Sequence, residues 1–185
     1  MYGLVNRAIQ ELVIERFGEA VWAQILTRAG LDKPVFLSHE GYPDGLTYDL
    51  VAGVSEVLEL DPEVVLKEFG RYWIEHTGKV GYADLIAACG STLGEFLENL
   101  PGLHTRVLLA FPNLTPPEFA TSVDGSNAAR IEYWSHRPGL TPMVVGLLEG
   151  LGELFGQRVE VSASADNTDG HGLFFLSWAA LEAAA

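Results

Sequence analysis

The sequence predicts an α+β protein, with a helical N-terminal half followed by an antiparallel sheet of two hairpins around one helix. Up to residue 111, apolar side chains recur at three- and four-residue spacing, which is typical of amphipathic helices. After the Pro116-Pro117 pair the apolar period becomes two, which is typical of strands. The turn sequences DGSN and DNTDG each separate two such segments. Helices followed by strands, rather than alternating with them, favour the α+β class.

The helices of the first half are predicted from the residues that begin and end them. Gly18 separates the first two helices and Gly30 ends the second, because glycine readily adopts the left-handed conformation that follows helix C-termini. Asp61 and Pro62 begin a later helix, as its cap and as the first residue of its first turn. The predicted helices span residues 2–17, 19–28, 47–58, 61–77, 82–89 and 91–111, the last capped by Ser91, with a loop over 31–45.

The second half is predicted as two strands, a helix and two more strands. The predicted strands span residues 118–123, 129–135, 158–165 and 172–178, and the helix spans 141–155. At 185 residues the chain fits one domain with a substantial core. Within this single domain we expect a helical lobe over roughly the first third, residues 1–60, and a second lobe over residues 61–185.

The composition limits the possible partners. The formal net charge is −14, from 25 acidic and 11 basic residues without a Lys/Arg run, so neither nucleic acid nor an anionic membrane surface is expected to bind. The single cysteine, Cys89, excludes an internal disulfide and a multi-cysteine metal site. The N-terminal segment carries charged residues within its apolar pattern and predicts neither a signal peptide nor a membrane span, so a cytoplasmic protein is expected. A hydrophobic content of 48% suggests a large interior that could enclose an apolar ligand.

The helix predicted over residues 91–111 contains a proline and a histidine. Pro101 removes one backbone hydrogen bond and crowds the preceding turn, so we expect a kink or a restart there. His104 lies in the apolar stripe, one turn after Leu100 and one turn before Leu108. A buried imidazole without a partner costs about 1–3 kcal/mol, so His104 needs either a hydrogen-bond partner or a metal. The helix by itself leaves both alternatives open.

Three polar residues alternate at the end of the second predicted strand. Tyr133, Ser135 and Arg137 are two residues apart, so they project to one face. Two hydroxyls and a guanidinium can form an anion receptor, in which arginine binds a carboxylate in bidentate fashion. The alternative is that these residues form the solvent-exposed face of the strand, with Trp134 turned toward the core. Spacing alone leaves both possibilities open.

Four motifs in this order resemble the haem–nitric oxide/oxygen binding (H-NOX) domain, which also occurs in soluble guanylate cyclases. They are MYGLVNRAI at the N-terminus, LPGLH, the Pro-Pro turn and YWSHR, and the resemblance covers nearly the whole chain. It implies that His104 is the proximal ligand of a b-type haem and that Tyr133, Ser135 and Arg137 bind the haem propionates. It also implies that a proline after the histidine helix distorts the macrocycle, and spacing from the histidine selects Pro117.

The same resemblance implies a distal pocket whose hydrogen-bond donors select the gas. Family members that hold dioxygen use a distal tyrosine, and alignment on Gly146 places Met143, which has no donor, at that position. Trp73 is an open question, because its indole N–H could reach a bound gas, whereas its neighbours on the helix favour ordinary core packing. The expected pocket residues are Val5, Ile9, Trp73, Met143 and Leu147.

The function implied is that of a sensor binding nitric oxide and carbon monoxide at ferrous haem, with stable dioxygen binding unexpected. The signal would arise when the His104–iron bond weakens or breaks and the haem relaxes. The sensor would have no catalysis of its own and would regulate a separate signalling enzyme, such as a histidine kinase or a cyclic-dinucleotide enzyme. Two other classes stay open: a non-haem module that binds an apolar ligand or a protein, and a haem enzyme, which lacks support because no distal acid–base pair is evident.

Overall fold

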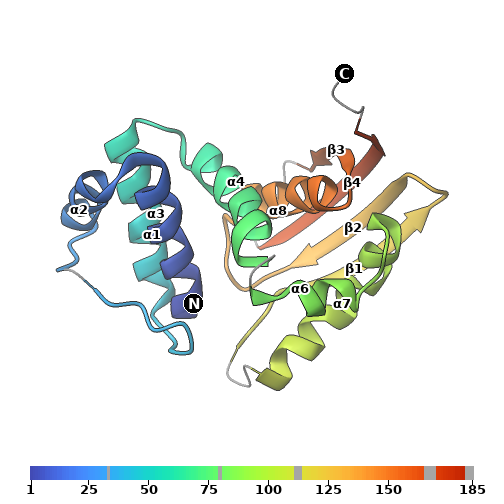
Figure 1. The fold of residues 1–185 in the computed structure, drawn as a ribbon, viewed down its shortest axis with the longest axis horizontal. Coiled ribbons are helices and arrows are strands. Elements are labelled where there is room, and N and C mark those ends of the chain that lie inside the picture. Colours follow the sequence, from blue (N-terminus) through green and yellow to red (C-terminus); the bar gives the residue numbers. More distant parts are fainter. Residues whose placement is uncertain (33, 79–80, 111–113, 165–169, 182–185) are drawn as a thin grey trace. The chain divides into compact units, whose positions relative to one another are not determined.

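The computed structural model describes residues 1–32, 34–78, 81–110, 114–164 and 170–181 (Figure 1). Within these residues, helices precede a four-stranded antiparallel sheet, and the predicted α+β class is confirmed. The chain forms two compact units, residues 1–69 and residues 70–185. No helix in the described part of the chain combines the length and the apolar character needed to cross a bilayer.

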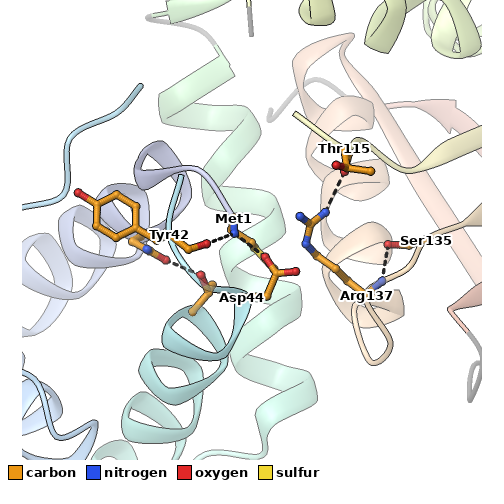
Figure 2. A network of polar contacts seen from close by, with 8 residues as sticks. Met1, Tyr42, Asp44, Thr115, Ser135 and Arg137 are labelled. Atoms are coloured by element: carbon orange, nitrogen blue, oxygen red, sulfur yellow. Dashed lines mark hydrogen bonds and ion pairs between the residues drawn. The ribbon is translucent and has the colours of Figure 1, made fainter. Parts of the chain in front are cut away.

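Unit 1 is helical, as predicted. It contains α1 (Gly3–Phe17), α2 (Glu19–Arg28), α3 (Asp44–Leu58) and the first part of α4 (Pro62–Tyr72). Helix α3 begins three residues before the predicted Thr47, because Asp44 provides an acidic first turn after Pro43. Thr47 therefore lies inside the helix, where its hydroxyl hydrogen-bonds Asn6 Oδ1 at 2.6 Å. At the N-terminus, the Met1 ammonium donates to the Tyr42 carbonyl at 2.6 Å and pairs with the Asp44 carboxylate (Figure 2).

Unit 2 continues α4 and adds two helices on the sheet. Its strands are β1 (Glu118–Asp124), β2 (Ala128–Trp134), β3 (Gln157–Ala163) and β4 (His171–Ala180), in the order β1-β2-β4-β3. Its remaining helices are η1 (Trp73–Gly78), α6 (Ala83–Ala87), α7 (Leu93–Ala110) and α8 (Thr141–Leu154). Helix α7 packs against β1 and β2, and α8 packs against β3 (Figure 1). The core between them includes Phe96, Leu97, Ile131, Leu148 and Phe174.

Two helical predictions differ from the structure in detail. The helix predicted to end near Thr77 has the right extent, but from Trp73 its hydrogen bonds follow the wider π pattern. Helix α7 is continuous through Pro101, so the proline does not restart it. The turn before the proline is buried in the core, where Phe96 and Leu97 are at most 2% exposed.

The helix that carries His104 begins at Leu93 and is capped by Thr92 rather than by the predicted Ser91. The Glu95 N–H donates to Thr92 Oγ1 at 3.2 Å, and Glu95 Oε2 accepts from the Ser91 N–H at 2.7 Å and from the Ser91 hydroxyl at 2.8 Å. This arrangement is a capping box shifted by one residue. The hydrogen bonds from the Ser91 backbone and hydroxyl stabilise the carboxylate and lower the pKa of Glu95.

Glu95→Gln is expected to destabilise the protein near pH 7. Because the pKa of Glu95 is lowered on folding, its contribution is present above the ordinary value of 4.5 and is lost as the pH falls through the folded value. The difference from wild type should therefore vanish in acid. Urea unfolding at neutral and acidic pH measures this.

Glu98→Gln is the matched control, since Glu98 is exposed on the same helix and has no hydrogen bond or ion pair within the described ranges. Equal losses in the two variants at neutral pH would contradict a specific role of the Glu95 cap.

Candidate functional site

His104 lies on α7 beside the first strand of the sheet. Its half-buried ring stacks on Phe119 of β1, with ring centroids 5.5 Å apart and planes 9° apart. Neither ring nitrogen has a hydrogen-bond partner among the residues that the structure describes. Burial lowers the pKa of His104, so the imidazole is neutral at pH 7 and can offer a lone pair. The alternative of a hydrogen-bonded core histidine therefore has no support in the described chain.

Tyr133 faces the core, contrary to the alternative in which Trp134 turns inward. Tyr133 is 2% exposed, whereas Trp134 is 39% exposed. The Tyr133 ring lies 5.3 Å from Phe119 and 6.3 Å from Phe174, measured between centroids. Phe119 therefore contacts both the His104 ring and the Tyr133 ring.

Ser135 and Arg137 follow β2 rather than alternating along it, because the strand ends at Trp134. The Arg137 N–H donates to Ser135 Oγ at 3.1 Å, and the Ser135 N–H donates to the Gly170 carbonyl at 2.7 Å. Burial raises the pKa of Tyr133, and a hydrogen bond with Ser135 and the charge of Arg137 partly offset this. The three predicted residues are thus brought together, although by a turn and not by strand alternation.

The Arg137 side chain is directed at the segment before β1. Its Nη1 donates to the Thr115 carbonyl at 2.9 Å (Figure 2). Thr115 precedes the half-buried Pro116 and Pro117. Pro117 therefore lies between Thr115, whose carbonyl accepts from Arg137, and Phe119, whose ring stacks on His104. Its predicted effect on the shape of a haem stays a prediction.

The predicted distal residues lie on helices of both units. On α8, Met143 and Leu147 are half-buried and one turn apart, hence on one face. Trp73 begins η1 and packs against the core of unit 2. On α1 in unit 1, Val5 is half-buried and Ile9 is 3% exposed. That these side chains line one gas pocket stays a prediction.

A close helix crossing holds the end of α4 against α8. A Cβ at Gly70 would overlap the Met143 carbonyl and would lie 2.8 Å from the Leu147 nitrogen, so only glycine permits this approach. Arg71 pairs with Glu149 at 3.6 Å and with Glu153. The crossing fixes Trp73, two residues after Arg71, relative to the backbone of Met143.

Three residues that sequence reasoning missed complete the site. Phe119 could have been found, because it occupies a core-facing position of the predicted first strand. Thr115 acts through its backbone carbonyl, and no side-chain pattern signals such a contact. Gly170 ends the sequence DNTDG, which predicts a turn, but its approach to Ser135 depends on tertiary structure.

A neutral histidine and an aromatic neighbour, next to two hydroxyls and a guanidinium, form the kind of site that suits a flat apolar ligand with anionic groups. A family model described as Haem-NO-binding matches residues 2–163. The chain therefore belongs to this family, the H-NOX family, and the resemblance seen in the sequence is confirmed.

Relatives with this region include soluble guanylate cyclases of two animals. Gcy-34 and gcy-32 of Caenorhabditis elegans are each 31% identical, over 158 and 153 residues, and soluble guanylate cyclase 89Da of Drosophila melanogaster is 24% identical over 170 residues. The alignments cover 83%, 80% and 91% of this chain but 23%, 22% and 26% of those proteins. The chain thus spans about a quarter of the length of these relatives.

Solved structures with the same fold cover almost the whole chain. An H-NOX protein from S. oneidensis in the Fe(II)NO ligation state has a TM-score of 0.86 at 19% identity, covering 97% of this chain and 99% of that one. The Fe(II) unliganded H-NOX protein from K. algicida has a TM-score of 0.87 at 19% identity and 100% coverage of both chains. At such identities the likeness establishes the fold.

Gly170→Ala is expected to destabilise the protein more than Gly125→Ala does. Both glycines have positive φ, +70° and +64°, so both substitutions carry a left-handed penalty of about 1–2 kcal/mol. Only at position 170 would the new Cβ overlap the Ser135 carbonyl, since nothing lies within 4 Å at position 125. Chemical unfolding of the two variants measures the difference, and equal destabilisation would refute the proposed tight contact at Ser135.

Proposed function

We propose that this chain binds a b-type haem through His104 and senses nitric oxide. The observation that carries the proposal is a neutral imidazole without a hydrogen-bond partner in the described ranges, joined through Phe119 to a cluster of phenol, hydroxyl and guanidinium. Family membership supports the same cofactor.

The residues present fit this group chemically. The His104 lone pair would bind iron, while Tyr133, Ser135 and Arg137 would bind the two propionates through hydroxyl donors and a charged fork. Such a haem would supply a ferrous iron with one face open to a diatomic gas. Burial keeps His104 neutral and therefore competent as a ligand at pH 7.

Gas choice follows from the donors that the chain offers on the open side. Met143 and Leu147 have no hydrogen-bond donor, and neither have Val5 and Ile9. Dioxygen needs a donor for the partial negative charge that it acquires, whereas nitric oxide and carbon monoxide depend on one far less. We propose binding of nitric oxide and carbon monoxide without stable dioxygen binding, and that Trp73 stays packed in the core rather than donating to the gas.

The proposed signal starts at His104. His104 would hold the iron, and nitric oxide would weaken that bond. Release of the imidazole would free α7 from the constraint, and Pro117 would no longer act on the shape of the haem. The relatives carry this region as about a quarter of longer proteins that are named as guanylate cyclases. We propose that this chain likewise regulates a signalling enzyme and catalyses no reaction itself, and that the enzyme is a histidine kinase or a cyclic-dinucleotide enzyme, as the family resemblance implies.

Absorption spectra of the haem-supplemented ferrous protein test the proposal. We expect a Soret band that shifts with nitric oxide and with carbon monoxide, and a spectrum just after air exposure that matches the one under argon. A protein without a Soret band would instead favour a non-haem ligand-binding module. A stable new spectrum in air would refute the proposed gas selectivity.

Met143→Tyr is expected to confer dioxygen binding, because it places a hydroxyl donor where the wild-type chain has none. Met143→Phe is the control, since it adds a ring of similar size without the hydroxyl. A spectral change in air confined to the tyrosine variant is the expected result. A change in both variants, or in neither, would contradict the assignment of Met143 to the distal side.

A further inference from the structure

Five consecutive residues, 115–119, connect the parts of the proposed haem site. The Thr115 carbonyl accepts a hydrogen bond from Arg137 Nη1 at 2.9 Å. Phe119 stacks on His104 and also contacts Tyr133. Pro116 and Pro117 lie between these two contacts. One short segment therefore contacts the proposed iron ligand at one end and the proposed propionate-binding arginine at the other.

The segment is stiff enough to transmit a displacement. Each proline ring fixes its own φ near −65°, and each proline also restricts the residue before it to extended conformations. Thr115, Pro116 and Pro117 therefore have little torsional freedom. From Glu118 the chain is held in the sheet, with Phe119 opposite Tyr133. A shift of the Thr115 carbonyl must move Pro117 or strain this run.

Arg137 is itself held on two sides. Its backbone N–H donates to Ser135 Oγ, and the Ser135 N–H donates to the carbonyl of Gly170, the residue before β4. The guanidinium carries five donors in a planar fork. One of these, on Nη1, donates to the Thr115 carbonyl, and the proposed function assigns others to a propionate carboxylate.

We propose that Arg137 is a positioning residue for Pro117 and, through Phe119, for the His104 ring, in addition to its role toward the propionates. This inference rests on the proposed function for its haem-dependent part. It predicts that propionate binding and haem distortion are coupled through one side chain. Replacing Arg137 should therefore leave the 115–119 segment less firmly positioned, both in the haem-free and in the haem-loaded protein.

The haem-free protein gives the first test, by NMR of the His104 ring protons. Stacking on Phe119 shifts these protons, and Phe119→Leu defines the complete loss of that ring-current shift. Arg137→Gln should remove a substantial part of it. Arg130→Gln, which makes the same substitution at a half-exposed arginine of β2 that pairs with Glu132, should leave it unchanged. An unaltered shift in Arg137→Gln would overturn the proposal whether or not the protein binds haem.

The haem-loaded protein gives the second test, by resonance Raman bands that report out-of-plane distortion. Pro117→Ala should flatten the macrocycle, and Arg137→Gln should produce most of the same change. The double variant should match Pro117→Ala alone, because both substitutions act on one segment. Tyr133→Phe should weaken haem retention without flattening. Two results would overturn the proposal in a protein that binds haem as expected. One is that the effects of Pro117→Ala and Arg137→Gln add in the double variant, and the other is that Arg137→Gln causes no flattening.

Discussion

The contact of Phe119 with both His104 and Tyr133 is the interaction on which the rest of the site depends. The ring of Phe119 stacks on the imidazole at 5.5 Å and lies 5.3 Å from the phenol. Phe119 thereby joins α7, which carries the proposed iron ligand, to β2, which carries the first of the proposed propionate-binding residues. The stack also covers one face of the imidazole with hydrocarbon, which favours the neutral form that a metal ligand requires. A polar residue at position 119 would remove that support without touching the histidine.

Periodicity in the sequence was sufficient to predict the fold class, because helical and strand periods occupy separate halves of the chain. It also selected His104, since a polar ring in an apolar stripe demands an explanation. Periodicity could not show that β2 ends at Trp134, which places Ser135 and Arg137 in a turn. The end of α4 illustrates the same limit, because the π hydrogen-bond pattern from Trp73 depends on packing that residue types do not encode.

The tertiary contacts that complete the site involve backbone atoms. Arg137 bonds a carbonyl of Thr115, and Gly170 is required by its proximity to the Ser135 carbonyl. Any residue type supplies a carbonyl, so such partners leave no signal in a single sequence. Solved H-NOX structures with TM-scores of 0.86 and 0.87 at 19% identity show how far sequence can diverge within this fold. The chemistry of the site therefore depends on the side chains of this chain rather than on the shared fold.

Resonance Raman spectroscopy of the ferrous protein without gas shows whether the proposed bond between the His104 imidazole and iron exists. Labelling the histidines with ¹⁵N should shift an iron–histidine stretching band to lower frequency. The band should disappear in His104→Gly and return when that variant is supplied with imidazole. A band that persists in His104→Gly without imidazole, or a wild-type band insensitive to the label, would contradict the account.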